Sequence, residues 1–145
     1  MQIEWSASRW LIPCVITAGL MIGSAPAWAI DISWRTTTSS RTQGDNYTYE
    51  GTAVFAGEEA HFTGGGTRNG SPTRRTAAGE TIYKFSDGSG FTVRFMSTRI
   101  GTAFRQVGIF INGTGRYAGM IGSATAVQER PGTNVWTGSY ELVTE

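Results

Sequence analysis

The feature that most constrains the fold of this chain is an alternation of apolar and polar residues that recurs along its length. Residues 46–55 (NYTYEGTAVF) show it most clearly, because an apolar residue or glycine occupies every second position from Tyr47 to Phe55. Side chains with this period lie on opposite faces of a β-strand, so that one face can be buried. No segment combines apolar residues at helical spacing with capping residues at its ends. The sequence therefore predicts an all-β protein.

The same alternation predicts about eight strands separated by turn-forming residues. The expected strands are residues 30–38, 46–55, 59–64, 81–86, 91–96, 103–111, 120–129 and 135–142. The connection DGSG, residues 87–90, separates the fourth strand from the fifth and is typical of a β-hairpin. Residues 39–45, 65–79 and 130–134 are expected to form loops, of which 65–79 is the longest and is expected to be exposed and mobile.

Eight short antiparallel strands can form either a sandwich or a closed barrel. Closure removes the exposed strand edges, and glycines within strands, such as Gly51 and Gly108, suit the bends that a small barrel needs. The sequence therefore favours a closed eight-stranded antiparallel β-barrel, which is wide enough to be packed with side chains or to hold one small ligand. The pattern leaves open whether the face with Tyr47 and Tyr49 or the opposite face with Glu50 lines the interior.

The first 29 residues have the pattern of a secretory signal peptide rather than of a folded domain. Residues 10–22 (WLIPCVITAGLMI) form an uncharged apolar run, and the small residues that follow it end in Ala27-Trp28-Ala29. This order predicts cleavage after Ala29. The run is too short for a membrane-spanning helix, which needs about 20 apolar residues. We therefore expect an exported protein, periplasmic or extracellular, with residues 30–145 as one β-barrel domain and no membrane span after cleavage.

Composition excludes several classes of function for residues 30–145. The only cysteine, Cys14, lies in the predicted signal peptide, so thiol chemistry and cysteine-bound metals are excluded. Residues 30–145 contain 11 basic and 10 acidic residues, because Arg9 and Glu4 lie in the predicted signal peptide, and their net charge is +1. These charges are scattered along the sequence, so no basic groove for nucleic acid is expected. His61 is the only histidine, so neither a histidine-based triad nor a zinc site is expected. We predict no cofactor and no metal.

The glycine-rich stretch INGTGRYAGMIGSATA, residues 111–126, raises the question of a phosphate-binding loop. Such a loop needs a lysine after its last glycine and a helix behind it, and a dinucleotide site needs GxGxxG spacing. Here no lysine follows, and Gly113, Gly115 and Gly119 are spaced one residue too far apart. The stretch is instead expected to turn the chain between two late strands, with Gly113 and Gly115 at positive φ and Arg116 at the barrel rim.

The same stretch resembles the penultimate segment of the allene oxide cyclase and dirigent β-barrels. In those barrels a strand is followed by Gly-Thr/Ser-Gly-x-Phe/Tyr-x-Gly-x-x-Gly, which corresponds to residues 113–122 here. The hairpin of residues 82–93 and the segment WTGSYEL, residues 136–142, are similar to the neighbouring elements. The resemblance implies an eight-stranded barrel, commonly a homotrimer, with a mostly apolar cavity. Residues 31–41 lack the clustered acid and asparagine of the plant cyclases, so a true plant-type allene oxide cyclase is not expected.

Members of this superfamily bind reactive lipid or phenolic intermediates and steer their cyclisation or coupling. The resemblance therefore implies a barrel that binds a hydrophobic or phenolic small molecule and that works without a nucleophile or a metal. The candidate ligand-binding residues are the aromatic and charged residues of the expected strands: Tyr47, Tyr49, Glu50, Tyr83, Arg94, Phe104 and Tyr140. No catalytic residue is predicted.

Two further hypotheses are compatible with the sequence. In the first, the barrel is packed solid and the protein is a non-catalytic structural or interaction module of the cell envelope. In the second, two of Glu50, Glu80 and Glu141 converge in a cleft, at the ~5–9.5 Å separation of carboxylate-based glycoside hydrolases. The alternative for the mid-strand charges, Glu50 and Arg94, is that they face solvent, because an unpaired buried charge is very costly.

Overall fold

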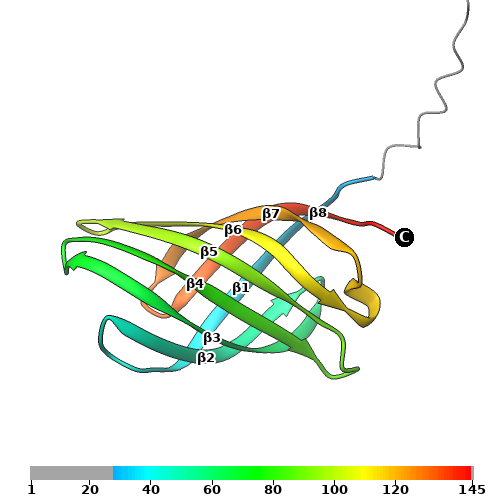
Figure 1. Cartoon of the computed structure of the whole chain (residues 1–145), viewed down its shortest axis with the longest axis horizontal. Coiled ribbons are helices and arrows are strands. Elements are labelled where there is room, and N and C mark those ends of the chain that lie inside the picture. Colours follow the sequence, from blue (N-terminus) through cyan, green and yellow to red (C-terminus); the bar gives the residue numbers. More distant parts are fainter. Residues whose placement is uncertain (1–27, 145) are drawn as a thin grey trace, which may run out of the picture.

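The computed structural model of the chain describes residues 28–144, which form a β-barrel of eight strands (Figure 1). The strands are β1 (Ile30–Arg41), β2 (Asn46–Phe55), β3 (Glu58–Ser71), β4 (Arg74–Phe85), β5 (Gly90–Ile100), β6 (Ala103–Thr114), β7 (Met120–Arg130) and β8 (Thr133–Leu142). Each strand pairs with the next, and β8 pairs antiparallel with β1, so the sheet closes on itself. The predicted eight-stranded antiparallel barrel is therefore confirmed.

The predicted signal peptide, residues 1–29, lies outside the described residues except for its last two positions. The first strand begins at Ile30, immediately after the expected cleavage point. Within residues 28–144, no helix is both long enough and apolar enough to cross a membrane.

The alternation of residues 46–55 buries the tyrosine-bearing face of β2. Tyr47 is only 5 % exposed and Phe55 is fully buried, whereas Glu50 on the opposite face is exposed. Aromatic side chains of the other strands point inward in the same way and pack against them. The face that lines the barrel interior is thus the one that carries Tyr47 and Tyr49.

One end of the barrel carries the C-terminus and the start of β1 (Figure 1). Aromatic side chains fill this end, and we call it the closed end. Phe55 lies at its centre. Its ring centroid is 4.9 Å from that of Phe91, 5.8 Å from that of Tyr117 and 6.0 Å from that of Tyr140. Rings at these separations and tilts bury a large apolar area, so this half of the barrel has a solid core.

Arg116 joins the turns that cover the closed end. It lies in η1 (Gly115–Tyr117), the short 3-10 helix between β6 and β7. Its guanidinium forms ion pairs with Glu58 and, at 3.4 Å, with Asp87, and its Nε donates a hydrogen bond of 3.2 Å to the hydroxyl of Ser89. It also lies 4.9 Å from the ring centre of Phe85. Arg116 therefore sits at the rim of the closed end, as expected, and connects three turns there. We call Arg116 and its partners Glu58, Asp87 and Ser89 the Arg116 clasp.

The glycine-rich stretch turns the chain as predicted, but one of its glycines has a different role. Gly115 and Gly119 have φ of 60° and 74°, which glycine adopts without strain. Gly113 does not have a positive φ, and Asn112 beside it does, at 52°. A Cβ on Gly113 would collide with the carbonyl oxygen of Tyr117. Gly113 is therefore needed for a close approach of two backbone segments and not for its φ.

The prediction of a mobile loop over residues 65–79 is wrong. β3 runs on to Ser71 and β4 begins at Arg74, so the chain turns within a few residues. Glycine is normally depleted in strands, which is why the composition of this segment suggests a loop. Here Gly66 pairs with Gly79, and a Cβ on either would collide with the backbone of the opposite strand. The glycines therefore let two strands approach closely instead of interrupting them.

Candidate ligand cavity at the open end of the barrel

The end of the barrel opposite the closed end holds a cavity of ≈ 410 Å³ that opens to solvent, and we call it the open end. The turns after β1, β3, β5 and β7 surround it (Figure 1). All eight strands contribute side chains to its lining. A cavity of this volume falls within the range of about 300–1,000 Å³ that is usual for small-molecule sites.

Four aromatic side chains form the base of the cavity, and we call them the aromatic floor: Phe62, Tyr83, Phe95 and Trp136. Trp34 supports the floor from below, because its ring stacks on that of Trp136 with centroids 5.3 Å apart. The indole N–H of Trp34 also donates a hydrogen bond of 3.4 Å to the hydroxyl of Tyr83. Burial raises the pKa of Tyr83 above its ordinary value, so its phenol is neutral at physiological pH. The floor is thus a packed and uncharged surface.

Tyr49 forms a wall of the cavity above the aromatic floor. Its hydroxyl lies 2.5 Å from Oγ1 of Thr81, and its ring stacks on that of Tyr47 with centroids 5.9 Å apart. Gly64 lies behind the ring, and a Cβ at Gly64 would occupy the place of the ring itself. The glycine therefore makes the room in which Tyr49 lies. Burial raises the pKa of Tyr49, so it offers a neutral hydroxyl to the cavity.

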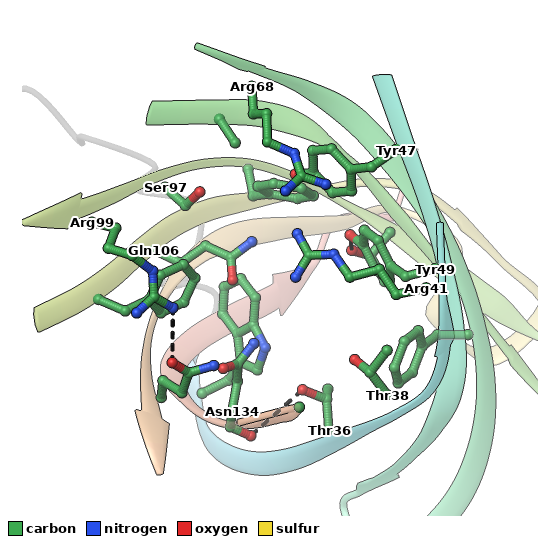
Figure 2. A pocket seen from close by; sticks show the side chains of 18 of the residues that line it. Thr36, Thr38, Arg41, Tyr47, Tyr49, Arg68, Ser97, Arg99, Gln106 and Asn134 are labelled. Atoms are coloured by element: carbon green, nitrogen blue, oxygen red, sulfur yellow. Dashed lines mark hydrogen bonds between the residues drawn. The ribbon is translucent and has the colours of Figure 1, made fainter. Parts of the chain in front are cut away.

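Arginine side chains from four strands form the mouth of the cavity, and we call them the arginine rim: Arg41, Arg68, Arg75 and Arg99. Figure 2 shows Arg41, Arg68 and Arg99 extending into the space between the strands. The guanidinium carbons of Arg41 and Arg68 lie 4.8 and 4.6 Å from the ring centre of Tyr47. Arg99 donates a hydrogen bond of 2.8 Å to Gln128. The rim is therefore held by cation–π and amide contacts, and no carboxylate takes part in those contacts.

A bulge in β1 places Arg41 inside the barrel, and regular alternation along β3 places Arg68 there. The pairing of β1 with β2 shifts between Thr38 and Ser40, after which Arg41 lies directly opposite Tyr49. Cross-strand partners share a face, so the bulge turns Arg41 toward the interior. Arg68 lies four positions after Gly64 on β3, so its side chain lies on the same inward face of the strand. Inward placement thus follows from strand register.

The environment of Arg68 is unusual for a charged side chain. The residue is only 8 % exposed, and its Nε and Nη2 atoms are buried with no hydrogen-bond acceptor, as is Nε of Arg75. Burial, followed by the charges of Arg41 and Arg75, lowers the pKa of Arg68 from its ordinary value. Arginine nonetheless stays protonated in proteins. Arg68 therefore places at the open end a positive charge that is largely removed from water.

The structure brings together part of the ligand-binding set expected from the sequence. Four of the expected residues line the cavity: Tyr47, Tyr49, Tyr83 and Phe104. Tyr140 lies instead in the closed end, where its ring packs against Phe55 and Phe110. Glu50 and Arg94 are exposed on the outside of the barrel, and Arg94 pairs there with Glu80 at 2.8 Å. These two charges face solvent, as the alternative hypothesis for them expected.

The carboxylates of the hydrolase hypothesis do not meet in this cavity. Glu50 and Glu80 border a shallow hollow on the outer surface of β2, β3 and β4, and Glu80 is held there by Arg94. Glu141 lies on β8. The described residues 28–144 contain no group of three or more His, Cys, Asp or Glu that could hold a metal ion. His61 is an exposed residue of β3.

Sequence reasoning missed the four residues of the arginine rim, Gln106 and Asn134 of the cavity wall, and three residues of the aromatic floor: Phe62, Phe95 and Trp136. Arg68 and Arg75 fall in the segment whose glycines suggest a loop, where no strand was predicted. A signal was present, because Gly64, Gly66 and Arg68 keep the period of the inward residues. Arg41 had no such signal, since its orientation depends on a bulge.

A scan against protein-family models and a search of curated proteins find no match to this chain. The resemblance to the allene oxide cyclase and dirigent barrels therefore stays a prediction. A function for the protein has to be inferred from the geometry and the charge of the cavity.

Proposed function

We propose that this protein binds an aromatic small molecule, such as a phenolic compound, in the cavity at the open end of the barrel. The observation that carries the proposal is the cavity itself, ≈ 410 Å³ in volume above a floor of aromatic rings. Apolar pockets with a few well-placed polar groups are the usual sites for small ligands. A ligand ring can stack on Trp136, and ligand hydroxyls can hydrogen-bond to Tyr49 and Gln106, which also line the cavity.

The lining supports binding and orientation rather than covalent chemistry. Among the described residues that line the cavity there is no carboxylate, histidine or thiol. A bound ligand would therefore be influenced through its position and through the groups that surround it. Steering of a cyclisation or coupling is compatible with such a site. Export from the cell and assembly into a homo-oligomer remain predictions from the sequence and from its resemblance.

The alternative of a solidly packed structural module draws support from only one end of the molecule. The closed end is filled by rings around Phe55. The open end is lined by residues from all eight strands and is not filled by them. The presence of that cavity favours ligand binding over a purely structural role.

Two neighbouring alanines of β4 provide a matched test. Ala77 lines the cavity and is partly buried, whereas Ala78 lies on the opposite face and is exposed. The probe is methyl 4-hydroxycinnamate, a neutral phenolic ester, and its binding is followed by the intrinsic tryptophan fluorescence, to which Trp136 and the Trp34 ring stacked on it both contribute. We expect saturable binding to the wild type, a loss of about tenfold or more in affinity for Ala77→Phe, and a change of no more than about twofold for Ala78→Phe.

Two results would contradict the proposed function. One is the absence of a saturable signal with this ester and with other neutral and acidic phenols. The other is binding that survives Ala77→Phe unchanged, since the ligand would then lie outside the cavity. Thermal unfolding of both variants is measured alongside, so that a loss of binding is not confused with a loss of fold.

A further inference from the structure

Positive charge at the open end of the barrel is not balanced by a carboxylate within the cavity. The arginine rim contributes four guanidinium groups, and none of the residues lining the cavity is aspartate or glutamate. Asp45, in the turn after β1, favours the charged form of Arg68, but it does not line the cavity. The like charges of Arg41 and Arg75 act on Arg68, which is buried, so this arrangement costs stability unless an anion is present.

Three arginines elsewhere in the described chain pair with carboxylates. Arg35 pairs with Glu129 at 3.0 Å, Arg94 pairs with Glu80 at 2.8 Å, and Arg116 pairs with Glu58. Arg74, Arg105 and Arg130 form no ion pair with a described residue, but their side chains are exposed to water. The arginine rim differs from both groups, because Arg68 is buried and Arg75 is partly buried without a carboxylate partner among the described residues.

Unused hydrogen-bond donors accompany this unpaired charge. Nε and Nη2 of Arg68 and Nε of Arg75 are buried without an acceptor. Buried N–H groups are nearly always hydrogen-bonded, and leaving a charged one unpaired costs more than leaving a neutral one. Arg68 is more than nine-tenths buried and lines the cavity, so the acceptor that it lacks has to be supplied from within the cavity.

We propose that the ligand of this cavity carries an oxyanion, a carboxylate or a phosphate, which binds among Arg41, Arg68 and Arg75 while the rest of the ligand lies on the aromatic floor. This inference rests on the proposed function and names the class of its ligand: an aromatic acid rather than a neutral aromatic compound. The guanidinium group is suited to this role, because its donors match two oxygens of a carboxylate or a phosphate at once.

The position of the rim relative to the floor fixes the orientation of such a ligand. The rim residues lie near the ends of β1, β3 and β5 and the start of β4, beside the turns of the open end. Trp136 and Tyr83 lie further along their strands, toward the middle of the barrel. The ring of the ligand therefore lies inside and its anionic group lies toward the mouth. On the opposite wall, the buried Oδ1 of Asn134 has no donor and can accept a hydrogen bond from a ligand hydroxyl.

Calorimetric titration of the full-length protein with 4-hydroxycinnamate and with its methyl ester tests the inference. The two probes share a ring and differ in charge, so the acid is expected to bind about tenfold or more tightly than the ester. Arg75→Gln and Arg68→Gln are each expected to weaken binding of the acid more than binding of the ester, so that most of this preference is lost. Arg74→Gln is the matched control, because Arg74 adjoins Arg75 but is exposed and does not line the cavity.

Inorganic phosphate provides a readout that does not depend on the aromatic part of the ligand. In a buffer without oxyanions, Arg68→Gln is expected to unfold at a temperature no lower than that of the wild type, because it removes an unpaired buried charge. Millimolar phosphate is expected to raise the unfolding temperature of the wild type and of Arg74→Gln, but not that of Arg68→Gln. Acetate, which like phosphate lacks an aromatic ring, is compared with phosphate at the same concentration: a stronger response to acetate identifies carboxylate as the preferred group, and the reverse order identifies phosphate.

The outcomes separate the two proposals. If the acid and the ester bind equally well and phosphate has no effect, the oxyanion site is wrong and the aromatic cavity stands. If neither aromatic probe binds but phosphate stabilises the protein through Arg68, the anion site stands and the aromatic ligand is wrong. If the preference for the acid survives in both Arg68→Gln and Arg75→Gln, the arginine rim is not the anion site.

Discussion

Arg74 and Arg75 show how much the role of a single residue in this barrel depends on the face of the strand that it occupies. They are adjacent in sequence and have the same chemistry, yet Arg74 is exposed outside the barrel and Arg75 lines the cavity. Glu50 and Tyr49 form a similar pair on β2. Because side chains alternate between the two faces of a strand, a shift of one position moves a side chain from the outer surface of the barrel to the cavity. Residue type alone therefore does not identify the binding residues.

Aromatic residues could be assigned from the sequence more reliably than the arginines. A tyrosine or phenylalanine in an alternating segment is expected to face inward, since burial of its ring is favourable. The sequence pattern left open which face of residues 46–55 lines the interior, and the structure places Tyr47, Tyr49 and Tyr83 inside, on the side that this argument favours. The same argument places an arginine outside, and it fails for Arg68, whose burial leaves donor groups unpaired. Arginine side chains favour water, so a rule that places residues by this preference cannot predict that Arg68 is buried.

Phe55 is the residue whose loss should most weaken the closed end. It is fully buried among several rings, so Phe55→Ala leaves a cavity and is expected to lower the free energy of unfolding by about 3–5 kcal/mol. Val54→Ala is the control, because Val54 is 55 % exposed and its truncation should cost no more than about 0.5 kcal/mol. Denaturant unfolding measures both values, and similar values for the two variants would contradict the packed core described for the closed end.

At the scale of strands and turns, the sequence predicted the centres of the elements better than their ends. The hairpin at residues 87–90 was expected from its Asp-Gly connection and joins β4 to β5. The extensions of β3 to Ser71 and of β1 to Arg41 were not expected. They depend on facing glycines, whose cross-strand partners are not visible in a local window, and on a bulge. Both extensions carry residues of the arginine rim, so the unpredicted part of the fold contains the charged part of the site.

The clasp around Arg116 predicts how the turns of the closed end respond to acid. The hydrogen bonds to Arg116 and to Ser89 lower the pKa values of Glu58 and Asp87, respectively, below their ordinary values. A lowered carboxyl pKa stabilises the folded protein above the pKa of the unfolded chain, about 4, and this stabilisation is lost as the pH falls through the folded value. Glu58→Gln is therefore expected to lower the unfolding temperature modestly at pH 7 and to have little effect near pH 2.

The neighbouring carboxylate serves as the control for the clasp. Glu59 is exposed and forms no ion pair among the described residues, so Glu59→Gln should leave the unfolding temperature nearly unchanged at both pH values. Thermal unfolding followed by circular dichroism measures the four values. An effect of Glu58→Gln that is equally large near pH 2 would show that its charge is not the stabilising feature.

At the scale of the whole molecule, the barrel divides into a half with a packed aromatic core and a half with an open cavity, the proposed ligand site. The closed end holds the aromatic core around Phe55 and the clasp of Arg116. The open end holds the cavity, the aromatic floor and the unpaired charge of the rim. Functional sites commonly retain groups that reduce stability, and a packed region elsewhere offsets their cost. The barrel architecture could be predicted from strand number and closure, whereas this division required the register of every strand.

A crystal structure of the protein grown with 4-hydroxycinnamate tests most directly the central claim that the open end is a binding site for an aromatic acid. The account predicts one ligand in each barrel, with its ring against Trp136 and its carboxylate within hydrogen-bonding distance of Arg68 or Arg75. A cavity closed by collapsed side chains, or a ligand that is found only on the outer surface of the barrel, would contradict it.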